Sequence, residues 1–313
     1  MSIRVNVDNF VRAETGRMLA DLQRKSGGVN RFSHEREPAD IAHQLVIRLN
    51  RDTLYSFAVV DLREGATLTL PEHGERYLSA MVVNEDHFIN EIFHDAGTYE
   101  LTREKFGTRY VAVAVRILVD PADPADLAAV AALQDQLAVT AGSSVPFELP
   151  DYDAPTLDET RRSLLDLARN MTNFDGAFGT RDQVDPIRRL IGTAAGWGGL
   201  PVSEAVYIGV DPRLPQGKYE LTVGADVPVD GFWSISVYNA DGFFEPNERG
   251  AYTVNNITGV RNDDGSVTVR FGDYPVDVPN AIPVTEGWNY LVRLYRPRPE
   301  IADGTWTFPM LAE

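Results

Sequence analysis

Two stretches of short strand-forming runs, separated by a helical stretch, limit this chain to a few architectures. Before residue 120, runs rich in β-branched and aromatic residues alternate with turn residues such as Glu64-Gly65 and Phe106-Gly107, and after residue 205 the pattern returns. Short strands at this spacing are typical of antiparallel sandwiches and barrels. The fold class expected is mainly β with helical additions. The clearest predicted strands are Gln44–Leu49, Leu54–Leu62, Thr67–Leu70, Arg76–Val83, Tyr110–Val119, Phe232–Asn239, Val267–Phe271 and Trp288–Tyr295.

The 313 residues exceed the usual size of one domain, so two domains are the natural expectation. We expect an N-terminal helical arm over 1–29, an N-terminal β domain over 30–120, a helical connector over 121–200 and a C-terminal β-sandwich domain over 201–313. Capping signals predict four helices: residues 8–26 behind Asp8, one from Pro124, one from Thr156 with Glu159 three residues on, and 186–196 behind Asp185. Asn262–Gly265 predicts a hairpin turn between Thr258–Val260 and Val267–Phe271.

Composition narrows the possible partners. The net charge of -17 argues against nucleic acid and against an acidic membrane surface, because both need a concentrated basic face. The sequence contains no cysteine, which excludes disulfides and thiolate metal sites. The N-terminus lacks an apolar core of signal-peptide length and no apolar run approaches a membrane span. We therefore expect a cytoplasmic protein.

A charged cluster, Asn50–Ser56, interrupts the strand-forming residues of the N-terminal region. One hypothesis makes it a catalytic site, with Arg51 as an anion clamp, Asp52 as a general base and Tyr55 as a hydrogen-bond donor. The alternative is a structural network in which the charges pair and pin a corner of the sheet. Neither alternative can be chosen from the residues alone.

The string Asn50-Arg51-Asp52-Thr53-Leu54-Tyr55-Ser56 resembles the signature of the bacterial domain-of-unknown-function family 1254. Two later strings, Phe232–Phe244 and Leu291–Glu300, resemble its usual partner, family 1214. The resemblance implies two antiparallel β-sandwich domains, the C-terminal one jelly-roll-like, bridged by helices and often assembled into homo-oligomers. Members are sometimes labelled carboxylesterases, with no mechanism that can be transferred.

Histidine is scarce, and His87 and His94 lie in one acidic segment with Glu85, Asp86 and Glu91. Imidazole and carboxylate groups together can bind zinc, iron or manganese. However, two histidines seven residues apart on a helix would stand about 10 Å from each other, too far to share an ion. We therefore predict no metal site and take His87 as the best acid–base candidate.

Other features favour structural roles. Trp233 shares a strand face with Ile235 and Val237, which indicates a core position, and Arg293 is expected in surface ion pairs. No Gly-x-Ser-x-Gly motif occurs, so an α/β-hydrolase nucleophile elbow is excluded.

The function expected is that of an enzyme acting on a small molecule, a hydrolase or a lyase, at a polar pocket near the domain interface. The alternative is a non-catalytic small-molecule or carbohydrate-binding, or structural, oligomeric protein. The sequence identifies no cofactor. The partners expected are a small-molecule ligand and further copies of the chain.

Overall fold

A computed structural model describes residues 2–44, 47–169, 171 and 173–311 of the chain. The chain divides into two compact units, neither continuous in sequence. The first unit contains Met1–Arg36, Leu54–Leu118 and Ala128–Val202, and the second contains Glu37–Thr53, Val119–Leu127 and Ser203–Glu313. Each unit is therefore described by itself.

The first unit is built on two sheets. The larger has the order β1-β2-β7-β4-β5 and the smaller the order β6-β3-β8, with antiparallel pairing throughout their described registers. Strands β4 and β7 are buried along their whole length, which explains their nearly continuous runs of apolar residues. The strands are β1 (Ser33–His34), β2 (Thr53–Asp61), β3 (Ala66–Leu70), β4 (Leu78–Asn84), β5 (Ile89–Phe93), β6 (Gly97–Leu101), β7 (Tyr110–Leu118) and β8 (Ala138–Ala141).

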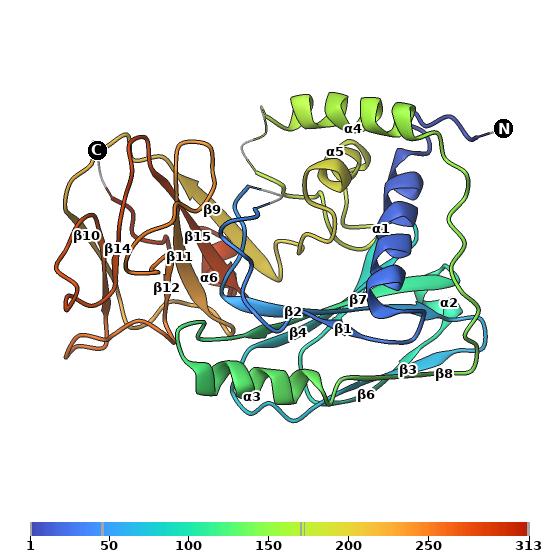
Figure 1. Ribbon diagram of the computed structural model, residues 1–313, viewed down its shortest axis with the longest axis horizontal. Coiled ribbons are helices and arrows are strands. Elements are labelled where there is room, and N and C mark those ends of the chain that lie inside the picture. Colours follow the sequence, from blue (N-terminus) through green and yellow to red (C-terminus); the bar gives the residue numbers. More distant parts are fainter. Residues whose placement is uncertain (1, 45–46, 170, 172, 312–313) are drawn as a thin grey trace. The chain divides into compact units, whose positions relative to one another are not determined.

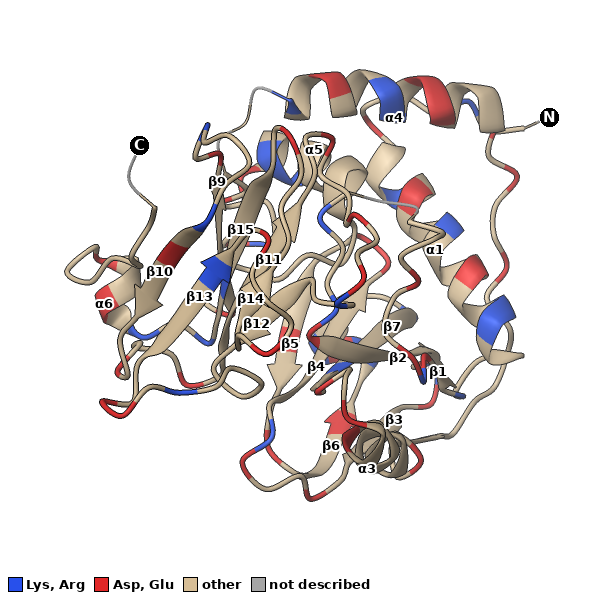
Figure 2. Cartoon of the chain, turned by 60° about the vertical axis from the view of Figure 1, so that its left-hand side comes forward, with Lys and Arg blue, Asp and Glu red and all other residues tan. Residues whose placement is uncertain are grey.

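Three helices, α1 (Phe10–Ser26), α4 (Ala154–Ala168) and α5 (Pro186–Gly196), pack together in this unit (Figure 1). They share a buried cluster that includes Phe10, Leu157 and Ile191. Acidic and basic residues alternate along the outer surfaces of α1 and α4 (Figure 2), as expected for helices with one face in solvent. This unit also contains the single-turn helix α2 (Arg103–Phe106). The longer helix α3 (Pro124–Gln134) spans the boundary between the units.

The second unit is a sandwich of two sheets, with the orders β12-β11-β15-β9 and β10-β13-β14. One apolar cluster joins residues of both sheets, among them Trp233 and Ile235 from β11 and Val269 and Phe271 from β13. The short β13–β14 pair is parallel, and the other described pairs are antiparallel. The elements are β9 (Ala205–Val210), β10 (Tyr219–Val223), β11 (Trp233–Tyr238), β12 (Thr253–Asn255), β13 (Val267–Phe271), β14 (Ala281–Ile282), β15 (Asn289–Tyr295) and α6 (Pro299–Ala302).

The fold class predicted from the sequence is confirmed: the protein is mainly β, with 27% strand and 20% helix. The helix predicted at 186–196 has those bounds, with Asp185 accepting hydrogen bonds from the amides of Ile187 and Arg188. Among the described residues, no helix combines the length and the apolar character that crossing a membrane requires.

Several local predictions were wrong. Gln44 and residues 47–49 are not in a strand, and residues 45–46 lie outside the described part of the chain. Thr258–Val260 is a turn rather than a strand, and β13 pairs with β10 instead. Helix α1 begins behind Asn9 rather than Asp8, and α4 begins behind Asp153, whose carboxylate accepts a hydrogen bond from the amide of Thr156. In α4 the stronger cap, Asp153, lies three positions before the predicted one, Thr156.

Candidate functional site

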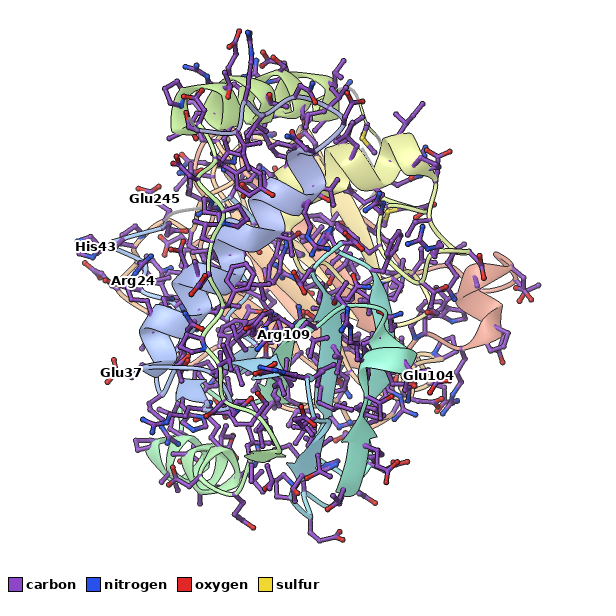
Figure 3. All side chains as sticks on the ribbon, turned by 90° about the vertical axis from the view of Figure 1, so that its right-hand side faces the viewer. Arg24, Glu37, His43, Glu104, Arg109 and Glu245 are labelled. Carbon is purple, nitrogen blue, oxygen red and sulfur yellow. The ribbon has the colours of Figure 1, made fainter. Side chains whose placement is uncertain are left out.

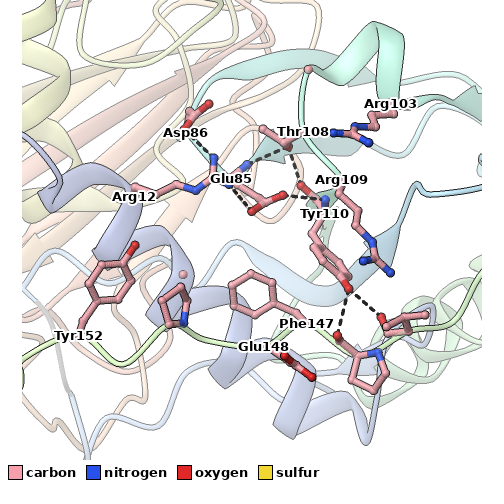
Figure 4. A pocket seen from close by; sticks show the side chains of 15 residues that line it. Arg12, Glu85, Asp86, Arg103, Thr108, Arg109, Tyr110, Phe147, Glu148 and Tyr152 are labelled. Carbon is pink, nitrogen blue, oxygen red and sulfur yellow. Dashed lines mark hydrogen bonds and ion pairs between the residues drawn. The ribbon is translucent and has the colours of Figure 1, made fainter. Parts of the chain in front are cut away.

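The first unit contains a polar cavity of about 550 Å³. Its wall combines α1, the β4–β5 turn, the segment from α2 to the start of β7, and the extended segment that precedes α4 (Figure 4). In Figure 3, Arg109 of this wall lies between α1 and α2. The residues that line the cavity are Arg12, Gly16, Glu85, Asp86, Arg103, Gly107, Thr108, Arg109, Tyr110, Val145, Pro146, Phe147, Glu148, Pro150 and Tyr152.

Arg12 of α1 bridges the two carboxylates of the β4–β5 turn. Its Nη2 lies 2.6 Å from Glu85 Oε2 and its Nη1 lies 2.7 Å from Asp86 Oδ1. The second oxygen of Glu85 accepts a hydrogen bond of 3.0 Å from the amide of Tyr110. The Glu85 side chain is 10% exposed, so its charge is held in place by a cation and an amide rather than by water. This part of the wall is preordered before any ligand arrives.

A second arginine of the wall, Arg109, is paired with Asp61 at the end of β2. The guanidinium donates from Nε and Nη2 to the two carboxylate oxygens at 2.9 and 3.2 Å, and it lies over the ring of Tyr110. The Asp61 side chain is fully buried, which by itself raises its pKa. Hydrogen bonds from Arg109, Ser143 and the amides of Arg63 and Val145 outweigh burial and lower the pKa of Asp61 to about 2.

The third arginine, Arg103 of α2, and the carboxylate of Glu148 differ from these pairs. Neither side chain has a hydrogen bond or an ion pair with any residue that the structure describes, and both are exposed in the cavity wall. In Figure 4 they lie on opposite walls, with the rings of Tyr110 and Phe147 between them. The phenol of Tyr110 donates to the carbonyls of Val145 and Pro146, each at 3.0 Å, so this residue presents its ring rather than its hydroxyl.

The β4–β5 turn that carries Glu85 and Asp86 is fixed on both sides. Asn84 accepts hydrogen bonds from the amides of Asp86 and Phe88 and donates one to the carbonyl of Phe106. His87 is 1% exposed and has a positive φ of 59°. Its Nε2 accepts a hydrogen bond of 3.0 Å from the amide of Gly198, so its Nδ1 carries the proton and donates to Thr193 Oγ1 at 2.8 Å.

His87 is therefore neutral in the folded protein. Burial, reinforced by the charge of Arg189, lowers its pKa to about 3. Its ring stacks on Trp197 and meets Phe178 edge-on. With both nitrogens occupied and the ring enclosed, these contacts favour a positioning role for His87 over the acid–base role predicted from the sequence.

Comparison with known families now bears on these features. The model described as protein of unknown function (DUF1254) matches residues 29–141, and that described as protein of unknown function (DUF1214) matches residues 212–299. Each match covers one segment of the chain, the DUF1254 match in the N-terminal half and the DUF1214 match in the C-terminal half. The resemblance seen in the Asn50–Ser56 string and in the two C-terminal strings is thus confirmed.

One solved structure shares the fold of this chain. The VPA0106 protein from Vibrio parahaemolyticus superposes with a TM-score of 0.72 at 17% identity, covering 97% of this chain and 96% of that chain. An uncharacterized protein from Burkholderia cenocepacia gives a TM-score of 0.49 at 13% identity, covering 93% and 84% of the two chains. Comparison with curated proteins returned no match. The likeness to the Vibrio protein is one of fold alone.

The DUF1254 signature is divided between the two units. Arg51 and Asp52 belong to the second unit, whereas Tyr55 and His87 belong to the first, and none of the four lines the cavity. Tyr55 stacks on Phe57, and the guanidinium of Arg116 lies 5.4 Å from the centroid of its ring. The four predicted site residues therefore do not form one site within either unit.

Asp52 is enclosed by DUF1214 strands in the second unit. Its side chain is fully buried, and Oδ1 accepts hydrogen bonds from Thr253 at 3.1 Å and Asn255 at 3.2 Å. Oδ2 has no partner among the described residues. The pairing with Arg51 that one of the two alternatives from the sequence required is not found among the described residues. The Arg51 guanidinium instead donates to the carbonyl of Ala39 and lies over the ring of Tyr252.

The negative charge of Asp52 is compensated by the nearby cation of Arg293. The surface position predicted for Arg293 was wrong. It is 2% exposed and donates to Ser236 at 2.7 Å, to Tyr238 at 2.7 Å and to the carbonyls of Arg48 and Leu49. Burial disfavours its charge, but the nearby Tyr238, Tyr295 and Asp52 more than offset this and raise its pKa. In contrast, Trp233 lies in the core as predicted.

Sequence reasoning missed most of the cavity. Glu85 and Asp86 were noticed only as neighbours of His87, and Arg12, Arg103, Tyr110 and Glu148 carried no local signal. Among the described residues, no group of three or more His, Asp or Glu side chains is placed to hold a metal ion.

Proposed function

We propose that the first unit binds a small polar organic molecule in the 550 Å³ cavity. The observation that carries this proposal is a cavity of ligand-site size whose wall holds both preordered polar groups and aromatic rings. Arg12, Glu85 and Arg109 are already fixed by their partners, so little ordering would be required on binding.

Binding without turnover is the better supported form of this proposal. The described residues that line the cavity include no serine, histidine or lysine that could act as a nucleophile on an ester, and the hydroxyl of Thr108 already donates to the carbonyl of Tyr110. Hydrolase or lyase activity remains a prediction of the sequence, and Glu148 is the carboxylate of the wall that could accept a proton.

The test is ligand-observed NMR on the full chain with a panel of sugars, sugar acids, amino acids and dipeptides. Phe147, whose ring meets that of Tyr110 edge-on at a centroid distance of 5.2 Å, gives the matched variant. Phe147→Ala should lower the affinity for any ligand of the cavity at least several-fold. Phe174→Ala removes a phenylalanine of the same unit that does not line the cavity and should leave binding unchanged. The proposal is refuted if no compound of the panel binds, or if Phe147→Ala weakens the binding of none of them.

Self-association and a cytoplasmic location also remain proposals. Strand β9 ends the four-stranded sheet of the second unit, and edge strands are often protected by assembly. Light scattering that reports a monomer at micromolar concentration would contradict the first, and fractionation of the producing cells tests the second.

A further inference from the structure

We propose that the ligand of the cavity is a zwitterion whose carboxylate and ammonium groups are at opposite ends, as in a short peptide with free termini. The carboxylate would bind Arg103 and the ammonium would bind Glu148. This inference rests on the proposed function, because it names the chemical class of the molecule bound at that same cavity.

The charge pattern of the wall is the first support. Two of its three arginines are already neutralised, Arg12 by Glu85 and Asp86 and Arg109 by the buried Asp61. The cation of Arg103 and the anion of Glu148 are left without partners among the described residues. The wall therefore offers one available charge of each sign, on opposite sides of the cavity (Figure 4).

Desolvation decides between ligand classes. A molecule that fills the cavity displaces water from both charged groups, and a charge that loses water without gaining a partner disfavours binding. A neutral sugar would supply no opposite charge to either group. An anion would satisfy Arg103 but leave Glu148 unpaired, and a cation would do the reverse. Only a zwitterion compensates both.

The surface between the two charges fits the body of such a molecule. The rings of Tyr110, Phe147 and Tyr152 line the cavity, and the Tyr110 hydroxyl is already engaged by the carbonyls of Val145 and Pro146. Ring faces pack well on planar amides and on hydrocarbon, so this region suits a peptide plane and an apolar side chain. Single amino acids carry both charges on one carbon, whereas a dipeptide separates them by a further residue, as the placement of the two groups on opposite sides of the cavity favours.

The first experiment compares blocked forms of one probe, the dipeptide Gly-Phe, by isothermal titration on the full chain. The probes are the free dipeptide, its N-acetyl form, its C-terminal amide and the doubly blocked form. The free dipeptide is expected to bind at least tenfold more tightly than either singly blocked form. If the N-acetyl form or the amide binds equally well, the zwitterion is refuted while the cavity remains a ligand site. If no probe and no compound of the NMR panel binds, the proposed function itself fails.

The second experiment exchanges the two charges. Arg103→Glu and Glu148→Lys should each lower the affinity for the free dipeptide at least tenfold. The double variant should restore most of this affinity, because it can bind the zwitterion in the reverse direction. Arg162→Glu and Glu159→Lys make the same charge changes on the exposed face of α4, outside the cavity, and should have no such effect. All four residues are exposed, so the variants should fold, which thermal unfolding checks. A double variant no better than the single ones would refute the end-to-end placement.

Discussion

The two units both bury carboxylate–arginine networks, but they place the charges differently. In the first unit Arg12 and Arg109 keep 43% and 30% of their side chains exposed while their acidic partners, Glu85 and Asp61, are buried. In the second unit both charges are buried: Asp52 accepts hydrogen bonds from β12, and Arg293 donates to side chains of β11. The first network leaves room for a ligand beside it, and the second network is closed around its own groups.

The difference indicates which network is a site and which is a structural element. A buried ion network contributes little net stability to a fold, yet removing one of its charges is costly. A network whose arginines are held in place but stay partly exposed at a cavity wall can contact a ligand without being rearranged. We therefore assign the signature residue Asp52 to the architecture of the second unit, whereas the proposed ligand site lies in the first unit.

The largest expected effect concerns His87, which is buried without charge in the first unit. Its pKa falls from 6.5 to about 3 on folding. The unfolded chain therefore binds a proton below pH 6.5 that the folded chain does not bind until about pH 3. The contribution of His87 to the free energy of unfolding is therefore fully present above pH 6.5. It decreases as the pH falls, by about 5 kcal/mol in all once the pH is below 3.

Urea unfolding of the first unit between pH 7 and 4 measures this effect. His87→Asn, in which asparagine tolerates the positive φ, should lower the free energy of unfolding at pH 7. It should also remove most of the dependence of that free energy on pH. A smaller slope of the same sign should remain from His34, whose pKa is also lowered by burial. An unchanged slope in the variant would show that His87 is not the titrating group.

The second prediction tests the closed network. Arg293→Met should destabilise the second unit by about 3–5 kcal/mol, because Asp52 loses its compensating charge and four acceptors lose their donor. Arg298→Met is the matched control: its ion pair with Asp230 is half exposed and should contribute almost nothing. Equal unfolding curves for the two variants would mean that Arg293 is not the centre of this network.

The third prediction concerns Asp61, which supports the wall of the cavity. The pKa of Asp61 is lowered from 3.8 to about 2. Its contribution to the free energy of unfolding is therefore fully present above about pH 5 and is lost as the pH falls toward 2. The shift corresponds to about 2 kcal/mol. Asp61→Asn should remove this acid-dependent loss, and NMR titration of the carboxyl carbon should show a midpoint near pH 2. A midpoint near 4 would contradict the account given of Arg109.

Prediction from the sequence succeeded where local signals define an element. The bounds of α5 followed from Asp185, Pro186 and the glycine at its end, and the alternation along β11 correctly placed Trp233 in the core. Strand type followed from apolar patterning even where β4 and β7 proved to be buried on both faces.

Prediction failed where the decisive partner is distant in sequence. Tyr238 of β11 is buried because its hydroxyl donates to the carbonyl of Leu49, which lies 189 residues earlier in the sequence. His87 is enclosed by Thr193 and Gly198, more than 100 residues later, and Arg12 meets Glu85 across 73 residues. Long-range pairing of this kind leaves no trace in periodicity or capping, so neither the cavity nor the closed network could be found from single positions.

The smallest effect is expected at Gly16, where α1 approaches the cavity. A Cβ built there would lie 3.1 Å from Leu149 Cδ1 and 3.7 Å from Phe147 Cζ, so alanine requires a small movement of an exposed and flexible leucine. Alanine also favours the helix by about 1 kcal/mol, and the two effects should nearly cancel in the free energy of unfolding. Gly16→Ala should nevertheless weaken the binding of a ligand in the cavity, because Gly16 lines the cavity and the added methyl group narrows it. Gly27→Ala is the control: at a φ of 70° it should destabilise α1 without changing binding. Unaltered affinity in Gly16→Ala with normal stability would indicate that the ligand does not reach the α1 side of the cavity.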